Sequence, residues 1–215
     1  MKTIYFVRHG ESENNAVRRF NSIDTPLSEI GMGQAETIAK RLARLPIKAI
    51  VSSDMLRAQQ TSLIISSRIG IPVETSSYFR ERVSATSILG KKRDDPSTVA
   101  AMKKIQDHFH DSGWRYEDGE NFEDLKKRAI EGLEYLEKRN EDAMAVVSHG
   151  IFMYIIAATV MFGSSLTSRE CMHIMESLGK LENTALTVVK RRSSKVEGSQ
   201  SPWRLMVWND HAHLG

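Results

Sequence analysis

Five side chains that could act together on a phosphate group follow short apolar segments of the sequence. Two are histidines, two are arginines and one is a glutamate. The set is Arg8 and His9 after residues 3–7, Arg57 after 49–52, Glu81 after 73–76, and His149 after 143–148. Because the parallel strands of an α/β sheet bring their carboxyl ends to one edge, where ligands bind, we expect these groups to meet there.

This combination of residue types suits the transfer of a phosphoryl group. The guanidinium groups of Arg8 and Arg57 can hold a phosphate through charge-assisted hydrogen bonds. Arg57 also falls in the first turn of a predicted helix, where free backbone N–H groups favour anions. A neutral imidazole such as that of His9 is a nucleophile near pH 7, and a second histidine can stabilise charge on the phosphate oxygens. A carboxylic acid such as Glu81 can protonate the departing oxygen.

Each of these residues also has an ordinary structural explanation when it is taken alone. Arg8 and His9 could form a surface pair, and His149 could be a buried histidine with satisfied hydrogen bonds. Glu81 could form an exposed ion pair of little energetic value. Their repeated placement after strand candidates favours one shared site over these separate explanations.

The elements that must position this site are strands alternating with helices. The strand candidates are short, apolar or β-branched, and bounded by polar or turn residues. Beyond the four segments above, they include residues 184–189 and 204–208. This alternation predicts βαβ units and an α/β fold, a three-layer α/β/α sandwich whose mixed sheet is mostly parallel. The last two candidates are joined only by residues 190–202, so we expect a hairpin that adds one antiparallel edge strand.

Four helices should cover this sheet, and apolar residues at a spacing of three and four define them. The first begins after Ser28, which is a suitable N-cap, and the second follows Asp54. The third spans residues 122–138, and the fourth starts near Gly150. The predicted buried faces of the second and third helices are Leu56, Leu63 and Ile64, and Leu125, Ala129, Leu133 and Leu136.

Residues 80–121 interrupt the alternation of strands and helices. They form a polar stretch with one helix candidate, at about residues 98–109. A long excursion of this kind is usually an insertion over one end of the sheet. It could form a lid on the site or a decoration of the surface, and the sequence favours neither. We therefore expect residues 1–215 to form a single domain with an insertion at about residues 80–121.

Composition argues against several other classes of protein. The single cysteine, Cys171, cannot form an internal disulfide or a cysteine-based zinc site. We expect no secretory signal at the N-terminus, and the longest apolar segment, residues 151–162, is too short to span a bilayer. The net charge is +3, and the basic clusters at residues 91–93 and 190–192 suit solvated loops better than nucleic-acid binding. We expect a soluble cytoplasmic protein with no nucleic-acid or membrane partner.

Several motifs, in order along the chain, resemble those of one enzyme family. The segment VRHGES at residues 7–12 is similar to the signature of the histidine phosphatase superfamily, which includes the cofactor-dependent phosphoglycerate mutases. Asn15 matches the asparagine that follows that signature. Further similar blocks are DTPLS at residues 24–28 with Gly31 and Gln34-Ala35, the segment at residues 52–61, Gly119-Glu120, and VSHG at residues 147–150.

The resemblance implies a role for each matching residue. His9 would be the nucleophile that becomes transiently phosphorylated, and Glu81 would be the acid and base. The implied phosphoryl-binding residues are Arg8, Asn15, Arg57 and His149, with the backbone of Gly150 nearby. Ser12 would contact the phosphate or only shape its loop, and Gly10 would allow close backbone approach. The arginines would do the work of a metal clamp, so neither a metal nor a cofactor is expected.

The segment after Glu81 departs from the family patterns. Residues 84–90 read SATSILG, where the mutases have a Tyr-Gly-x-Leu-x-Gly-like run and many phosphatases a Gly-x-Trp-Glu-Gly-like run. The leading hypothesis is a phosphomonoester hydrolase of the phosphatase branch. A cofactor-dependent phosphoglycerate mutase is the alternative, and a phosphate-binding module without turnover is a third hypothesis. The expected substrate is a small phosphorylated molecule or a phosphopeptide, selected within residues 82–119, and a homodimer is open because dimers occur in the family.

Overall fold

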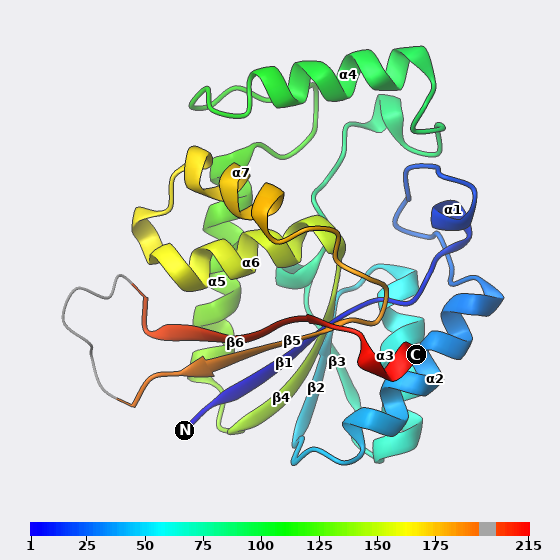
Figure 1. Cartoon of the computed structure of the whole chain (residues 1–215), viewed down its shortest axis with the longest axis vertical. Helices are drawn as coiled ribbons and strands as arrows, with labels where there is room; N and C mark the ends of the chain where they lie inside the picture. The colour runs from blue at the N-terminus through cyan, green and yellow to red at the C-terminus, as the bar shows by residue number, and fades with distance from the viewer. Residues whose placement is uncertain (194–200) are drawn as a thin grey trace.

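The structure is a computed structural model of the chain, and it describes residues 1–193 and 201–215. Its centre is a six-stranded sheet in the order β3-β2-β4-β1-β5-β6 (Figure 1). The strands are β1 (Thr3–Arg8), β2 (Ala49–Ser52), β3 (Val73–Thr75), β4 (Ala143–Ser148), β5 (Leu186–Arg191) and β6 (Trp203–Asp210). Every strand predicted from the sequence is confirmed, with ends that shift by a few residues.

Strands β1 to β4 run in the same direction, and the last two strands make one side of the sheet antiparallel. β1 pairs in parallel with β4, β4 with β2, and β2 with β3. β5 runs antiparallel to both β1 and β6, so the predicted hairpin forms the edge of the sheet. Residues 194–200 of the predicted connection lie outside the described residues. The carboxyl ends of β1 to β4 therefore lie along one edge, which we call the carboxyl edge.

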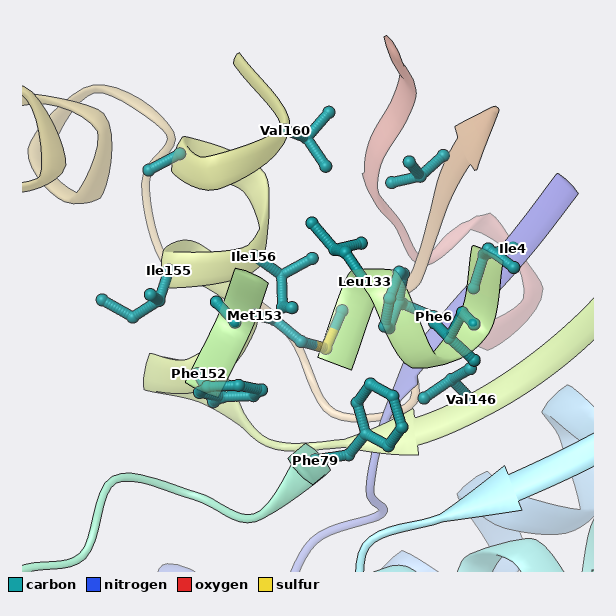
Figure 2. Packing of buried hydrophobic residues seen from close by; sticks show 14 of the residues in the cluster. Ile4, Phe6, Phe79, Leu133, Val146, Phe152, Met153, Ile155, Ile156 and Val160 are labelled. Carbon is teal, nitrogen blue, oxygen red and sulfur yellow. The ribbon is translucent and has the colours of Figure 1, made fainter. Parts of the chain in front are cut away.

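Helices cover both faces of the sheet, which confirms the predicted three-layer α/β/α sandwich (Figure 1). Val7 and Ile65 belong to the core under α2 and α3. Phe6 and Leu133 belong to the opposite core, under α5 and α6, which Figure 2 shows. Neighbouring residues of β1 thus enter different cores, as the two-residue period of a strand requires. The helices of these two layers are α2 (Glu29–Leu42), α3 (Leu56–Ile69), α5 (Phe122–Lys138), α6 (Gly150–Phe162) and α7 (Ser168–Ser177).

Three of the helices match the sequence-based prediction closely. The Ser28 hydroxyl caps α2 by accepting the Gly31 N–H at 3.0 Å. All four residues of the predicted inner face of α5 are buried. α6 starts at Gly150, directly after His149. Within the described residues, no helix is long and apolar enough to cross a membrane.

The inner face predicted for α3 is only partly right. Ile64 packs against the core under α2 and α3, but Leu63 is 56% exposed and Leu56 is only partly buried. The helix instead turns inward the side that carries Arg57 and Thr61, which are 1% and 0% exposed. A buried guanidinium needs polar partners from distant parts of the chain. Counting apolar residues along α3 does not reveal those partners, and so it misplaces the centre of the inner face.

Residues 80–121 lie beyond the carboxyl edge of the sheet and contain α4 (Pro96–Asp107), which confirms the helix predicted in this segment. Figure 1 shows α4 above α6 and α7, apart from both helical layers. Backbone hydrogen bonds tie this segment to the loop after β1, since the Phe20 N–H donates to the Lys91 carbonyl at 3.0 Å. That this segment moves as a lid, and that residues 1–215 form a single domain, remain predictions.

Candidate active site

The structure brings the predicted reactive side chains together at the carboxyl edge. β1 and β4 are neighbours, with Arg8 opposite Ser148, so His9 and His149 leave the sheet side by side. The centroids of the two imidazole rings are 5.0 Å apart, and the residues are 2% and 0% exposed. Arg57 reaches the same point from the first turn of α3. The edge therefore carries a buried cluster of two histidines and two arginines.

His9 is held in the tautomer that a nucleophile needs. Its Nδ1 atom lies 2.6 Å from the Gly10 carbonyl oxygen, which can only accept, so Nδ1 carries the proton. Nε2 is then unprotonated, and it accepts a hydrogen bond from Arg57 Nε at 3.2 Å. Burial, followed by the charges of Arg57 and Arg8, lowers the pKa of His9 well below its usual value. The imidazole is therefore neutral at pH 7, with a lone pair for attack on phosphorus.

Backbone contacts fix the loop that carries His9. A side chain on Gly10 would collide with the carbonyl oxygen of Gly31, so both glycines are needed where this loop passes the start of α2. The Gly10 N–H donates to Thr61 Oγ1 at 3.1 Å. The His9 carbonyl accepts a hydrogen bond from Asn183 Nδ2 at 3.0 Å. Three other parts of the chain, at Gly31, Thr61 and Asn183, thus hold the His9 loop in place.

Arg57 remains a cation although it is buried. Its Nη1 atom donates to the Ser22 carbonyl at 2.9 Å, and its Nη2 atom lies 3.1 Å from Met55 Sδ. Burial is the main cause that lowers the pKa of Arg57 to about 10, while the nearby Glu81 acts in the opposite direction. A positive charge beside His9 Nε2 is suited to bind a phosphoryl oxygen at the point of attack.

Arg8 has a buried donor without a partner. Its Nη1 atom donates to the Leu181 carbonyl, whereas its Nε–H has no hydrogen-bond partner within the described residues. Burial lowers the pKa of Arg8, but a guanidinium stays charged at neutral pH. A Cβ atom on Gly150 would lie 3.5 Å from Arg8 Nε, so the glycine keeps space open beside this donor. Since buried N–H groups are normally paired, this one indicates a place for a ligand atom.

His149 is only half satisfied, which argues against the alternative of a purely structural histidine. Its Nε2 atom hydrogen-bonds to Ser53 Oγ at 2.8 Å. Its Nδ1 atom is buried and has no partner in the described part of the chain. Burial first, and then the charge of Arg57, lowers the pKa of His149 well below its usual value. A neutral ring with a free nitrogen beside His9 can contact a phosphoryl oxygen.

Asn15 and Ser12 lie in the same loop but differ in whether their polar side-chain atoms have hydrogen-bond partners. Asn15 Oδ1 is buried and has no partner among the described residues. The Ser12 hydroxyl donates to Asn21 Oδ1 at 2.9 Å and accepts the Asn15 N–H at 3.2 Å, which caps the short helix α1 (Glu13–Ala16). Of the two roles open to Ser12, these contacts favour shaping the loop. Asn15 Oδ1 can only accept a hydrogen bond, so this amide could bind a phosphoryl oxygen only through its NH2 group.

Glu81 lies at the amino end of α6 and makes no surface ion pair with a described residue. Its carboxylate accepts the backbone N–H groups of Ile151 at 3.2 Å, Phe152 at 3.0 Å and Arg82 at 2.9 Å. The free N–H groups of a helix amino end favour a negative charge. A Cβ atom on Gly150 would lie 3.8 Å from Glu81 Oε2. The carboxylate therefore faces the same space as the unpaired guanidinium nitrogen of β1.

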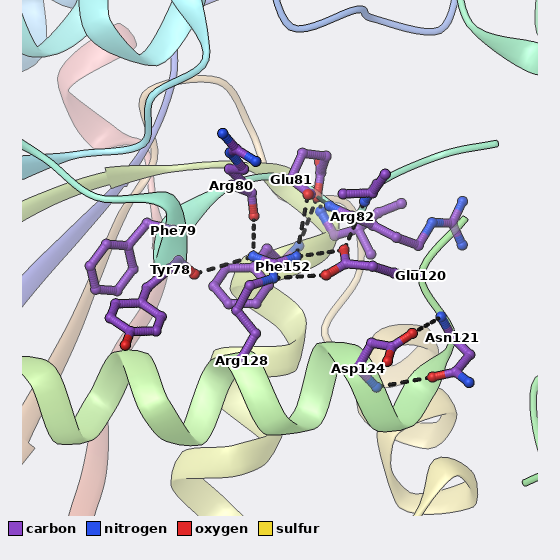
Figure 3. A network of polar contacts seen from close by, with 12 residues as sticks. Tyr78, Phe79, Arg80, Glu81, Arg82, Glu120, Asn121, Asp124, Arg128 and Phe152 are labelled. Carbon is purple, nitrogen blue, oxygen red and sulfur yellow. Dashed lines mark hydrogen bonds and ion pairs between the residues drawn. The ribbon is translucent and has the colours of Figure 1, made fainter. Parts of the chain in front are cut away.

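Arg128, which the sequence analysis did not single out, holds the Glu81 segment in position (Figure 3). Its Nη1 atom donates to the carbonyls of Tyr78 at 3.2 Å and Arg80 at 2.7 Å. Its Nη2 atom donates to the Glu81 carbonyl at 3.3 Å. The same guanidinium forms an ion pair with Glu120 at 2.7 Å. We call these contacts the Arg128 clamp.

A weak signal for the Arg128 clamp exists in the sequence. Arg128 follows Leu125 by three residues and precedes Gly132 by four, and both of those residues are buried on the inner face of α5. A charged residue on the buried face of a helix needs a polar or aromatic partner inside the protein. The Arg128 guanidinium has one, since it lies 4.0 Å from the centre of the Phe152 ring. Glu120 falls in a block that resembles the family, but its partner could not be assigned from that block.

Comparison with known proteins identifies the family of this site. The sequence profile of the histidine phosphatase superfamily (branch 1) matches residues 4–210. The chain belongs to the histidine phosphatase superfamily. Among similar members, a Yersinia pestis (strain Pestoides F) protein named "Probable phosphoglycerate mutase GpmB" is 30% identical over 221 aligned residues. That alignment covers 100% of this chain and 95% of the relative.

Solved structures share the fold of this histidine phosphatase superfamily member. Bacillus stearothermophilus YhfR is 26% identical, with a TM-score of 0.80 over 100% of both chains. A mycobacterial glucosyl-3-phosphoglycerate phosphatase in complex with VO3 is 24% identical, with a TM-score of 0.79 over 98% of this chain and 100% of that one. A phosphoserine phosphatase mutant from Entamoeba histolytica, in complex with phosphoserine, is 22% identical, with a TM-score of 0.77 over 100% of both chains.

Proposed function

We propose that this protein is a phosphomonoester hydrolase that works through a phosphohistidine on His9. The observation that supports this most directly is the unprotonated Nε2 atom of His9 beside Arg57, 3.2 Å away. Arg8 Nε and His149 Nδ1 are buried near it with no partner among the described residues. A tetrahedral anion at this point would give a partner to both atoms and would present phosphorus to the nucleophile.

The reaction would take place in two displacements. In the first, the His9 Nε2 lone pair forms a bond to phosphorus while the bond from phosphorus to the leaving oxygen breaks, and Glu81 donates a proton to that oxygen. In the second, Glu81 takes a proton from water, the water oxygen attacks phosphorus, and the N–P bond breaks. Inorganic phosphate leaves, and both residues return to their starting states. Arg8 and Arg57 would position the group and neutralise its charge.

The proposal includes independence from metals and organic cofactors. Within residues 1–193 and 201–215, no group of three or more His, Cys, Asp and Glu side chains could hold a metal ion. The two guanidinium groups beside His9 would supply the positive charge that a metal provides in other phosphoryl-transfer sites. A small phosphorylated substrate or phosphopeptide, and a cytoplasmic location, complete the proposal.

A phosphoglycerate mutase is the second candidate, because the 30% identical relative carries that name. Both activities start from the same phosphohistidine and differ in whether the intermediate is kept and rebound. The segment SATSILG after the proposed acid lacks the mutase-like run, which argues against the mutase, although it also departs from the run of many phosphatases. Incubation with 3-phosphoglycerate separates the two, since a hydrolase releases phosphate and a mutase forms 2-phosphoglycerate.

The direct test of the proposal is capture of the intermediate. The purified protein is mixed with p-nitrophenyl phosphate and quenched in alkali, and the phosphorylated residue is located by mass spectrometry. We expect an acid-labile phosphate on His9 during turnover. Release of nitrophenol with no phosphorylated protein, or with phosphate on another residue, would contradict the mechanism.

A further inference from the structure

A cavity of about 330 Å³ opens beside the proposed phosphate site, and its size suits a metabolite. Arg57 and Glu81 belong both to that site and to the lining of the cavity. Other lining residues, such as Leu89 and Met102, come from the segment at residues 80–121. With its phosphate next to His9, a substrate would have the rest of its structure in this cavity.

The charged groups of the lining are four arginines and one glutamate: Arg57, Arg80, Arg82, Arg93 and Glu81. Arg57 is already assigned to binding the phosphoryl group in the proposed reaction. Arg80 is neutralised by Asp54, whose carboxylate oxygens lie 2.6 and 2.8 Å from Arg80 Nε. Two cations, Arg82 and Arg93, therefore remain without a function in the proposed reaction.

The carboxylates near Arg82 already serve other donors. Glu81 accepts three backbone N–H groups, and Glu120 is paired with Arg128. The Arg82 guanidinium lies 3.9 Å from Met102 Sδ and makes no ion pair with a described residue. Figure 3 shows the Arg82 side chain extended away from the Arg128–Glu120 pair.

Arg93 brings a second cation to the same place. Its guanidinium lies 5.1 Å from the centre of the Phe20 ring, and it too makes no ion pair in the described part of the chain. Both arginines also line the groove under α4 that adjoins the cavity, so they stand where the two spaces meet. Burial is the main cause that lowers the pKa of Arg82, the charges of Glu81 and Glu120 raise it, and the charge of Arg93 lowers it by a smaller amount. An anion between the two guanidinium groups would offset the repulsion between Arg82 and Arg93.

We propose that Arg82 and Arg93 form a second anion-binding subsite, so that preferred substrates are phosphomonoesters carrying a further anionic group. This inference rests on the proposed phosphatase function of the His9 site. Guanidinium groups fit the paired oxygens of a carboxylate or a second phosphate. The backbone holds both residues before a ligand arrives, because Arg82 directly follows Glu81 in the Arg128 clamp, and the Arg93 N–H donates to the Arg18 carbonyl at 2.9 Å.

The test compares three substrates with the same propyl skeleton: propyl phosphate, 3-(phosphonooxy)propanoate and propane-1,3-diyl bisphosphate. For the wild-type protein we expect kcat/KM for at least one of the two doubly anionic substrates to exceed that for propyl phosphate by about 10- to 100-fold. The better of the two identifies the second anion as carboxylate or phosphate. Arg82→Gln and Arg93→Gln should each bring this ratio close to 1.

Lys92→Gln is the matched control, because Lys92 is an exposed cation of the same segment that does not line the cavity. It should keep the wild-type ratio. If the wild-type protein hydrolyses p-nitrophenyl phosphate but has a ratio near 1, or if both arginine variants keep the wild-type ratio, the subsite is refuted and the proposed function stands.

A binding measurement separates the subsite from turnover. His9→Ala is titrated by calorimetry with 3-(phosphonooxy)propanoate, propane-1,3-diyl bisphosphate and propyl phosphate. Tighter binding of a doubly anionic compound, lost in the double variants His9→Ala/Arg82→Gln and His9→Ala/Arg93→Gln, would support the subsite even if the protein hydrolysed no phosphate ester. Equal binding of all three compounds would overturn it.

Discussion

The carboxyl edge of the sheet and the segment at residues 80–121 contribute to the same cavity in different ways. At the edge, His9 and His149 are almost fully buried and leave neighbouring strands that are paired along their length. In the segment, Arg93 is exposed and is held through a few backbone hydrogen bonds to the loop after β1. We infer that the edge determines the chemistry and the segment determines which phosphate ester is chosen.

Removal of the proposed nucleophile should have the largest effect. We expect His9→Ala to lower kcat for p-nitrophenyl phosphate by at least about 10³-fold, because His9 Nε2 is the atom that attacks phosphorus in the proposed reaction. Circular dichroism and thermal unfolding should show that the fold is kept. His110→Ala, which removes an exposed histidine of the segment at residues 80–121, should retain activity. Near-normal hydrolysis by His9→Ala would refute the mechanism.

Replacement of the proposed proton donor should give a loss that depends on the leaving group. Glu81→Gln keeps the size of the side chain but cannot donate or accept a proton as a carboxyl group does, and general acid catalysis contributes about 10²- to 10⁴-fold. We expect a loss of this size with alkyl phosphates and a smaller loss in phosphoenzyme formation from p-nitrophenyl phosphate, with accumulation of phosphohistidine. The exposed Glu117→Gln is the control. An equal loss with both substrates would assign the proton transfer to another group.

The Arg128 clamp joins the two regions, and loosening it should have an intermediate effect. Arg128→Met removes the donors to the carbonyls of residues 78, 80 and 81, so the proposed acid would no longer be held at the amino end of α6. We expect a loss of about 10- to 100-fold with alkyl phosphates and a smaller loss with p-nitrophenyl phosphate. Lys127→Met, an exposed position on the same helix, is the matched control. A loss that is equal for both substrates would reduce Arg128 to a structural role.

The buried histidines of the edge should make stability depend on pH. The pKa of His9 is far below 6.5 in the folded protein, so between these two values the unfolded chain binds a proton that the folded chain does not. The free energy of unfolding should therefore fall as the pH falls below about 6.5, with a contribution from His9 of about 1.4 kcal/mol per pH unit. Urea unfolding of the wild type and His9→Ala should give curves that are parallel above pH 7.5 and converge or cross below 6.5. Curves that stay parallel at all pH values would contradict a buried, neutral His9 in the folded protein.

Removal of divalent metals should have the smallest effect. Because Arg8 and Arg57 supply positive charge at the edge, hydrolysis of p-nitrophenyl phosphate should survive prolonged dialysis against EDTA. The rate is measured before and after chelation, and again after addition of Mg²⁺, Mn²⁺ or Zn²⁺. Loss of activity on chelation, with recovery on addition of one metal, would show that the arginines are not sufficient.

The sequence predicted the parts of the fold and site that depend on short-range patterns. The strands, the Ser28 cap and the inner face of α5 follow from periodicities within a few residues. The meeting of His9 and His149 follows from a general property of parallel sheets, because both come directly after a strand.

The remaining features depend on contacts between distant residues, which local patterns do not encode. Arg128 contacts the backbone of Glu81, 47 residues away in sequence. Asn183 contacts the His9 carbonyl, 174 residues away. The inner side of α3 was predicted only in part for the same reason, since Arg57 hydrogen-bonds to the Ser22 carbonyl, 35 residues earlier in the chain.

The position of β1 within the sheet has a consequence for how the protein is made. β1 is synthesised before the other strands of this sheet, yet it pairs with β4, which begins at Ala143, and with β5, which begins at Leu186. The groups that hold Arg8 and His9, the Leu181 carbonyl and the Asn183 amide, are also synthesised long after β1. Until β4 and β5 have been synthesised, the nascent chain therefore carries the proposed nucleophile on an unpaired apolar strand, which favours aggregation. The proposed reaction would become possible only after β5 has joined the sheet.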